Sequence, residues 1–249
     1  MTLFLALSTL WHALWFSPQM FPFPGNPPVS GGGFTILHSL TVQSLSGTTL
    51  ACVAATCTLT VPAMGSGNSA ILMIAEVSGN NLTVSSVTGG GTWTSPANVR
   101  VFDAGEGMTT GLYNLSTTAG TTSLIINWTG GNPTSTFFTV AMYWEISGPI
   151  ALDIAGSVFN SSLSTTQHGP ALILSGSNDA IGQICGLSTG TVNSGASPYA
   201  ANFSNRDNGS QGGAFQFIGG SVALNIASGA SPVFSTSNAK GVCSGMALK

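Results

Sequence analysis

Apolar and polar residues alternate along most of the chain. Every second residue is apolar in 124–128 and in 140–146, and the same pattern recurs in 222–226 and 242–248. A period of two is typical of a β-strand that buries one face. The same reasoning predicts further strands at 35–44, 57–62, 69–78, 81–88, 99–103, 109–115, 151–158, 170–175, 180–187 and 213–219.

Turn-forming residues separate these runs. Clusters such as Ser78-Gly-Asn-Asn, Gly89-Gly-Gly and Gly130-Gly-Asn-Pro end one run before the next begins, and glycine, asparagine and proline favour tight turns. No window after residue 22 has a helical period. The pattern predicts an all-β fold, a jelly-roll-like two-sheet β-sandwich with an apolar N-terminal helix or extended arm.

The chain divides into three parts. Residues 1–22 are the most apolar stretch, residues 23–33 form a proline- and glycine-rich hinge, and residues 34–249 form the β-sandwich domain. The apolar stretch is a poor signal peptide because it lacks a basic start and a small-residue cleavage site. It is also too short before Pro18 for the ~20 residues of a membrane span. We therefore expect no stable membrane span.

The remaining interpretation of residues 1–22 is an assembly arm. An exposed apolar segment of this kind is neither ordered nor soluble unless something covers it. We expect another copy of the protein to do so. The large apolar residues of the arm are Leu3, Phe4, Leu5, Leu7, Leu10, Trp11, Leu14, Trp15 and Phe16.

Charge is scarce and excludes several function classes. The 249 residues include 4 Lys+Arg and 7 Asp+Glu, with a formal net charge of −3. The basic residues Arg100, Arg206, Lys240 and Lys249 are too few and too scattered to neutralise phosphates, which excludes nucleic acid as a main partner. The 43% hydrophobic content argues against disorder.

The four cysteines lack the Cys-x-x-Cys spacing of a metal site. Cys52 and Cys57 bracket four residues that a tight hairpin can connect, whereas Cys185 and Cys243 lie in two strand-like runs. We predict disulfides between 52 and 57 and between 185 and 243, the alternative being four free buried thiols. Disulfides indicate an oxidising compartment, and hence an extracellular or cell-surface location.

Six Asn-x-Ser/Thr sequons point toward the same location. Asparagine-linked glycans are one interpretation, and O-linked sugar on the Ser/Thr surface is the other. A chain this rich in Asn, Ser and Thr also forms sequons by chance. The candidate sites are Asn81, Asn114, Asn127, Asn160, Asn202 and Asn208.

Several of these segments together resemble a known group. The runs from Leu59-Thr-Val-Pro-Ala through Val84-Ser-Ser-Val-Thr-Gly-Gly-Gly-Thr-Trp-Thr to Leu152-Asp-Ile-Ala-Gly-Ser are similar to secreted, Gly/Ser/Thr-rich bacterial β-sandwich modules. The resemblance covers about residues 56–249 and includes the apolar final strand. It implies the fold and an extracellular location, and most members have no assigned activity. The apolar arm and the cysteine pairs are not part of it.

The sequence contains no convincing catalytic motif. Gly186-Leu-Ser-Thr-Gly190 fits G-x-S-x-G, but the chain has no histidine after it, as that elbow requires. Asp103 and Glu106 lie in a loop that we interpret as a solvated turn, with a calcium site as the lesser alternative. Glu76 and Glu145 are expected to point to solvent. We predict no catalytic residue, no metal and no cofactor.

Aromatic residues offer a different kind of site. A sugar-stacking platform needs exposed rings, for which we expect Trp93 and Tyr143 to be the best candidates, with Trp128 and Trp144 in the core. The other rings considered are Tyr113 and Tyr199.

The expected function is a structural subunit of an extracellular assembly. The favoured form is a surface filament or pilus-like fibre whose copies polymerise through the arm, since a head-to-tail contact that does not close forms a filament. The alternative is a secreted carbohydrate-binding or adhesive module, and the third is a viral capsid or decoration protein. The predicted partners are copies of the chain itself and glycans.

Overall fold

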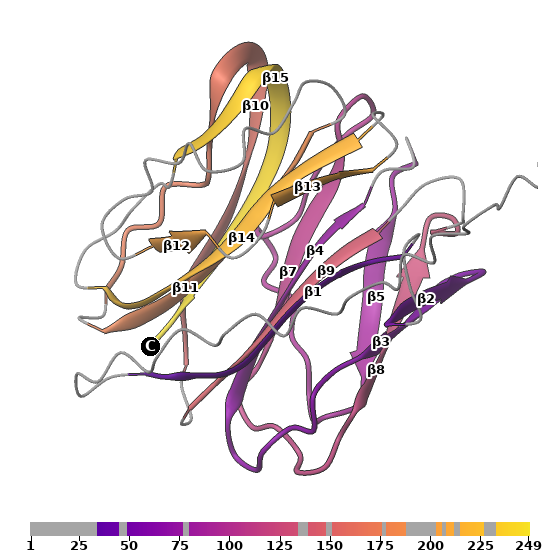
Figure 1. Cartoon of the computed structure of the whole chain (residues 1–249), viewed down its shortest axis with the longest axis vertical. Helices are drawn as coiled ribbons and strands as arrows, with labels where there is room; N and C mark the ends of the chain where they lie inside the picture. Colours follow the sequence, from indigo (N-terminus) through magenta and orange to yellow (C-terminus); the bar gives the residue numbers. More distant parts are fainter. Residues whose placement is uncertain are drawn as a thin grey trace, which may run out of the picture.

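Three antiparallel sheets make up the described part of the protein. The computed structural model describes residues 34–44, 49–76, 80–133, 139–147, 151–175, 178–187, 203–205, 208–211, 215–226 and 233–249. The arm and the hinge of the sequence analysis lie outside these ranges. Figure 1 shows the sheets as layers, with the four short strands β2, β3, β5 and β8 on one side and β10, β11, β14 and β15 on the other.

The central sheet has the strand order β1-β9-β4-β7-β6. Its strands are β1 (Ile36–Gln43), β9 (Thr139–Ile146), β4 (Ser69–Glu76), β7 (Gly107–Asn114) and β6 (Val101–Asp103). Every residue of β4 and of β9 is buried. These two strands therefore have protein on both faces.

The other two sheets cover the two faces of the central sheet. The small sheet has the order β2-β3-β8-β5 and consists of β2 (Leu50–Val53), β3 (Thr56–Thr60), β8 (Ser123–Thr129) and β5 (Thr83–Thr88). The large sheet has the order β10-β15-β11-β14-β12, with β13 also paired to β14. Its strands are β10 (Leu152–His168), β15 (Val233–Leu248), β11 (Asp179–Leu187), β14 (Phe215–Ile226), β12 (Phe203–Asn205) and β13 (Asn208–Gln211).

Two apolar layers result, one on each side of the central sheet. Ile71, Met73 and Trp144 point toward the large sheet, where they join a cluster with Ile184 and Met246. The next residues along the same strands point the opposite way, toward the small sheet. There the cluster includes Leu59, Leu72, Ile74, Ile126 and Tyr143.

The layered arrangement corrects the two-sheet prediction. The all-β fold is confirmed, and the described strands form three sheets where two were expected. Tyr143 was expected to be exposed opposite Trp144, and this was wrong because the small sheet covers that face and leaves Tyr143 at 0% exposure. The outward orientation expected for Glu76 and Glu145 was wrong for the same reason, since both are buried.

A segment expected to be a strand has a different role. Residues 170–175 follow β10 without entering a sheet, consistent with the missing backbone N–H of Pro170. Pro170 lies against Gly156 and Gly245 on the large sheet, and Leu172 is 2% exposed. We call residues 169–175 the cover segment, because it shields part of the outward face of the large sheet.

Candidate functional site

The outward face of the small sheet consists of short uncharged side chains. None of the strands β2, β3, β5 and β8 contains an Asp, Glu, Lys, Arg or His. In β3 the residues alternate so that Cys57 and Leu59 are buried and three threonines are exposed. The side chains exposed on this face are Ala51, Val53, Thr56, Thr58, Thr60, Ser86, Thr88, Ser123, Ile125 and Thr129.

Register places these side chains in rows across the four strands. Thr58 is paired with Ala51 on one side and with Ile125 on the other, and Ile125 is paired in turn with Thr88. In a neighbouring row Asn127 donates a hydrogen bond from Nδ2 to Ser86 Oγ at 3.0 Å. The face is therefore a continuous surface of methyl and hydroxyl groups with the Asn127 amide among them, which we call the threonine face.

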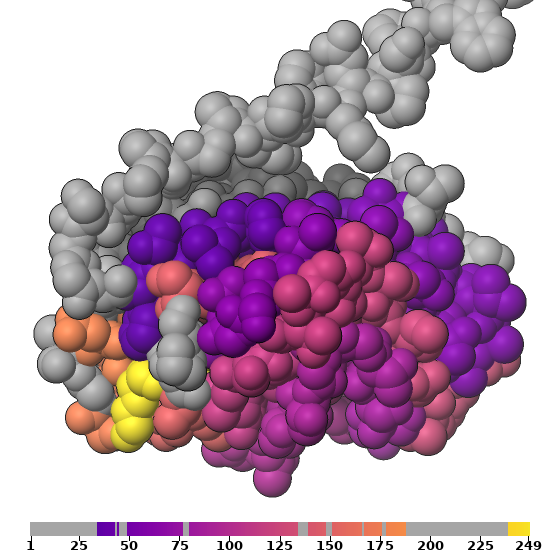
Figure 2. Space-filling model, turned by 90° about the horizontal axis from the view of Figure 1, so that it is seen from below, coloured from indigo at the N-terminus to yellow at the C-terminus, as the bar shows by residue number. Residues whose placement is uncertain are grey.

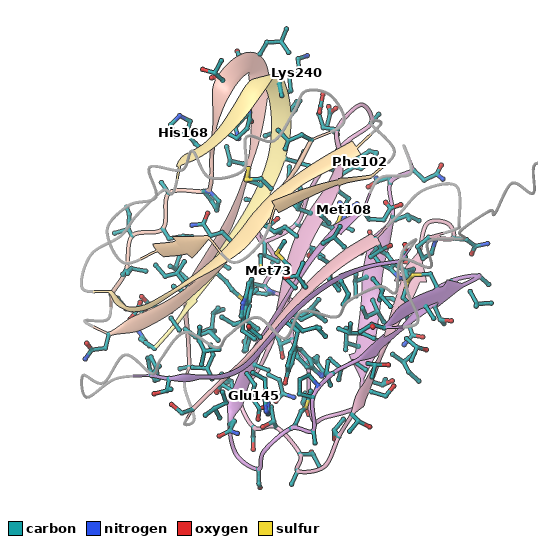
Figure 3. The ribbon with its side chains drawn as sticks, viewed as in Figure 1. Met73, Phe102, Met108, Glu145, His168 and Lys240 are labelled. Atoms are coloured by element: carbon teal, nitrogen blue, oxygen red, sulfur yellow. A yellow bond between two sulfur atoms is a disulfide. The ribbon has the colours of Figure 1, made fainter. Side chains whose placement is uncertain are left out.

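A buried carboxylate fixes one end of the central sheet. Glu145 Oε2 lies 2.6 Å from His38 Nδ1, and Glu145 Oε1 accepts hydrogen bonds from Asn68 Nδ2 at 2.7 Å and from the Gly65 amide at 2.8 Å. Burial opposes the charge, but hydrogen bonds from Asn68, His38 and Gly65 lower the pKa of Glu145 overall. Figure 3 shows Glu145 at the end of the sheet away from Lys240 and His168. The cluster ties β1 and β9 to the loop before β4.

A second polar cluster joins three strand ends of the large sheet. Lys249 Nζ donates to Asp153 Oδ1 at 2.8 Å, and the Ser175 amide donates to Asp153 Oδ2 at 2.7 Å. The Ser175 hydroxyl also bonds to Asp153. Asp179, at the start of β11, is fully buried, and neither of its side-chain oxygens has a hydrogen-bond partner among the described residues. Figure 2 shows that the yellow C-terminal residues reach the surface beside orange residues of the chain.

The two carboxyl groups of this cluster titrate in opposite directions. Burial, and after it the negative charge of Asp153, raise the pKa of Asp179 to about 6. Burial would also raise the pKa of Asp153, but hydrogen bonds from Lys249 and Ser175 lower it overall. The pair therefore holds one proton below about pH 6.

The structure contains both predicted cysteine pairs. Cys52 is directly opposite Cys57 across β2 and β3, and Cys185 is opposite Cys243 across β11 and β15. Each pair forms a disulfide, with Cα atoms 4.0 and 4.1 Å apart respectively. One bond therefore closes the hairpin of the small sheet, and the other joins two inner strands of the large sheet.

The sequons occupy different environments. Asn81 is exposed and accepts a hydrogen bond from Arg100, and Asn127 is partly exposed on the threonine face. Asn114 is 1% exposed, with its amide donating to Gly90 O and accepting from the Ser116 amide. Asn160 donates to His168 O at 2.9 Å.

Asn202 lies outside the described residues, and Asn208 is the first residue of β13. In the folded protein Asn81 and Asn127 are thus more accessible to a modifying enzyme than Asn114.

The other candidate residues are not brought together. Asp103 Oδ1 accepts from the amides of Gly105 and Glu106 in a closed turn. Trp93 is partly buried and donates Nε1 to Gly89 O at 2.8 Å, while Trp128 and Trp144 are in the core as expected. Within the described ranges no three His, Cys, Asp or Glu side chains gather as metal ligands.

Sequence reasoning missed both polar clusters. Asp153, Asp179 and Lys249 are far apart in the chain, and only the strand pairing of the large sheet brings them together. The available signal was that each of them lies at the beginning or end of an apolar strand-like run. In an antiparallel sheet the end of one strand lies beside the start of the neighbouring strand, which brings such residues together.

Comparison of the chain with protein-family models, with curated proteins and with solved structures found no match. No helix in the described ranges has the length and hydropathy of a membrane-crossing segment.

Proposed function

We propose that this protein is a structural subunit of an extracellular assembly, a filament whose copies polymerise through the apolar arm of residues 1–22. The observation that carries the proposal is the threonine face, four strands wide and without an ionisable residue. Surfaces of monomeric domains usually carry many charges, which keep the copies apart. A subunit that packs closely against its own copies benefits from their absence.

The arm provides the free energy of assembly. Burying a large apolar side chain contributes roughly 1.5–3 kcal/mol, and the arm contains a series of them along residues 3–16. Nine such side chains give a gross gain of about 14–27 kcal/mol, compared with the ~4–15 kcal/mol that association costs in lost freedom. A net charge of −3 adds little repulsion between packed copies.

The cysteines support the extracellular location. Both disulfides lie within β-sheets, and all four cysteines are used. Bonds of this kind form and persist in oxidising compartments. A rigid, cross-linked domain also suits a subunit that must keep its shape within a fibre.

The carbohydrate-binding alternative has less support from the described aromatic residues. Tyr143 and Trp144 are buried, and the Trp93 ring packs partly against the core with its N–H bonded to Gly89. The threonine face has no aromatic ring exposed on it. Sugar stacking needs such rings.

The experiment is to remove the arm and measure assembly. The full chain and a variant lacking residues 2–22 are compared by sedimentation velocity and by negative-stain imaging at equal concentration. The expected result is fibres for the full chain and a folded monomer for the variant, with the same circular dichroism spectrum. Fibres of unchanged abundance from the shortened chain would refute the role of the arm.

A control separates apolar character from length. In a full-length variant, Leu3, Leu5, Leu7 and Leu10 are replaced by serine, which preserves the number of residues and removes apolar surface. This variant is expected to behave like the deletion.

A further inference from the structure

The two outer sheets differ in what lies on their outward faces. Part of the outward face of the large sheet is shielded by the cover segment, and Gln183, Cys185 and Leu187 on that face are buried. The threonine face has no comparable cover, since Thr58 and Ile125 at its centre are both exposed. Among the described residues, the chain thus covers part of one outer sheet and leaves the outward face of the other exposed.

The exposed residues of the threonine face suit a close contact. Threonine, valine and isoleucine are branched at Cβ and lose little rotamer freedom when buried. Sheets with such residues pack face to face about 10 Å apart. The Cys52–Cys57 disulfide holds the β2–β3 hairpin in register, so the face is already ordered before contact.

The chemistry of the face selects its partner. A basic or acidic partner finds no opposite charge there, and a sugar finds no exposed aromatic ring. A hydroxyl group both donates and accepts, so a surface of threonine and serine hydroxyls interspersed with methyls complements a surface of the same composition. The threonine face of another copy is a surface with those properties.

We propose that the threonine face is a contact between copies, packing sheet against sheet on the threonine face of a second molecule. This inference rests on the proposed assembly function and names a second contact within it, besides the arm. Four strands about 4.8 Å apart and about six residues long at ~3.3 Å each give a face of roughly 400 Å². This is about half the ~800 Å² per partner of a stable interface, so the face acts together with the arm.

The test places a charge at the centre of the face in the full chain. Ile125→Lys and Thr58→Lys each put like charges against each other when two such faces meet. The critical concentration for assembly, measured by sedimentation, is expected to rise about tenfold, equivalent to the loss of one well-packed contact. Thermal unfolding of each variant checks that the domain is intact.

The matched control is Ile173→Lys, the same substitution at an exposed isoleucine of the cover segment. Ile173 is 82% exposed and Ile125 43% exposed. The control is expected to change the critical concentration less than twofold. An unchanged critical concentration in both face variants, or an equal rise in the control, would overturn the proposal.

A mixing experiment adds an outcome that misfolding cannot imitate. Thr58→Lys chains and Thr58→Glu chains each assemble poorly alone, and an equal mixture is expected to regain most of the original assembly because opposite charges then face each other. If the mixture stays dispersed, the face does not pack on itself.

The two proposals fail in different ways. Fibres that survive removal of residues 2–22 but are lost with Ile125→Lys would refute the arm and support the face. Fibres lost with the deletion but unchanged by the face variants would support the arm and refute the face.

Discussion

The small sheet and the large sheet pack on opposite sides of the same central sheet, yet they are built differently. The cover segment shields part of the outward face of the large sheet. The same sheet has the carboxyl groups of Asp153 and Asp179 at the ends of its strands. The small sheet has neither, and its outward face is a plain array of uncharged side chains. The difference indicates that one outer sheet is specialised for stability and the other for contact.

The largest expected effect concerns the two disulfides. The Cys185–Cys243 bond closes a separation of 58 residues and the Cys52–Cys57 bond one of 5. Chain-entropy arguments assign about 4 kcal/mol to the first and about 2 kcal/mol to the second. Urea unfolding of the two double Cys→Ala variants measures both. Equal losses would contradict the idea that the large sheet carries more of the stability.

The cover segment gives the next effect. Leu172→Ala removes a side chain that is 2% exposed and should cost about 2–4 kcal/mol of unfolding free energy. Ile173→Ala, one residue later and 82% exposed, should cost less than about 0.5 kcal/mol. Denaturant titration of the Leu172→Ala and Ile173→Ala variants measures the two unfolding free energies. Similar costs would mean that the segment does not shield the sheet.

The carboxyl pair predicts a dependence on pH. The folded pKa of Asp179 is about 6, above its ordinary value of 3.8, so its contribution to stability is complete below about pH 4 and is lost as the pH rises through 6. The shift corresponds to a few kcal/mol at most. Asp179→Asn, which cannot ionise, should remove this loss and narrow the difference in melting temperature between pH 5 and pH 7.5.

Asp153 is expected to change the stability with pH in the opposite direction to Asp179. Asp153 has a lowered pKa, so its contribution is present above its ordinary value and is lost at more acid pH. Asp153→Asn should therefore destabilise the protein at pH 7. If the melting temperature of Asp179→Asn depends on pH in the same way as that of the unmodified protein, the raised pKa of Asp179 does not contribute to stability.

The smallest effect belongs to the threonine face. Thr58→Val keeps the branched shape at an exposed position and should change the unfolding free energy by less than about 0.5 kcal/mol. Calorimetry of the dilute monomer measures it. A loss of several kcal/mol would mean that the face serves the fold of its own chain.

The alternation of apolar residues predicted most strands, and its errors about which strand faces are buried have one cause. In β8 every second residue is buried, as the pattern indicated. In β9 the pattern was taken as one buried face, although Ala141 and Tyr143 lie in a second apolar layer. The uninterrupted apolar run of residues 70–75 was the available signal, since strands covered on both faces have such runs. The third sheet was missed because that run was not taken into account.

The polar sites were less predictable than the strands. Glu145 was expected at the surface because a charged residue is rarely buried, but three hydrogen-bond donors compensate it there. Those donors come from distant parts of the chain, and only the folded arrangement reveals them. The cysteines were easier, because Cys52 and Cys57 are close in sequence and Cys185 and Cys243 lie in two predicted strand-like runs. The strand pairing of the structure then places each pair directly opposite.

Electron microscopy of the full chain beside the chain without residues 2–22 decides whether the arm drives assembly. We expect regular fibres in the first sample and dispersed single particles in the second. Dispersed particles in both samples, at concentrations well above micromolar, would contradict this expectation.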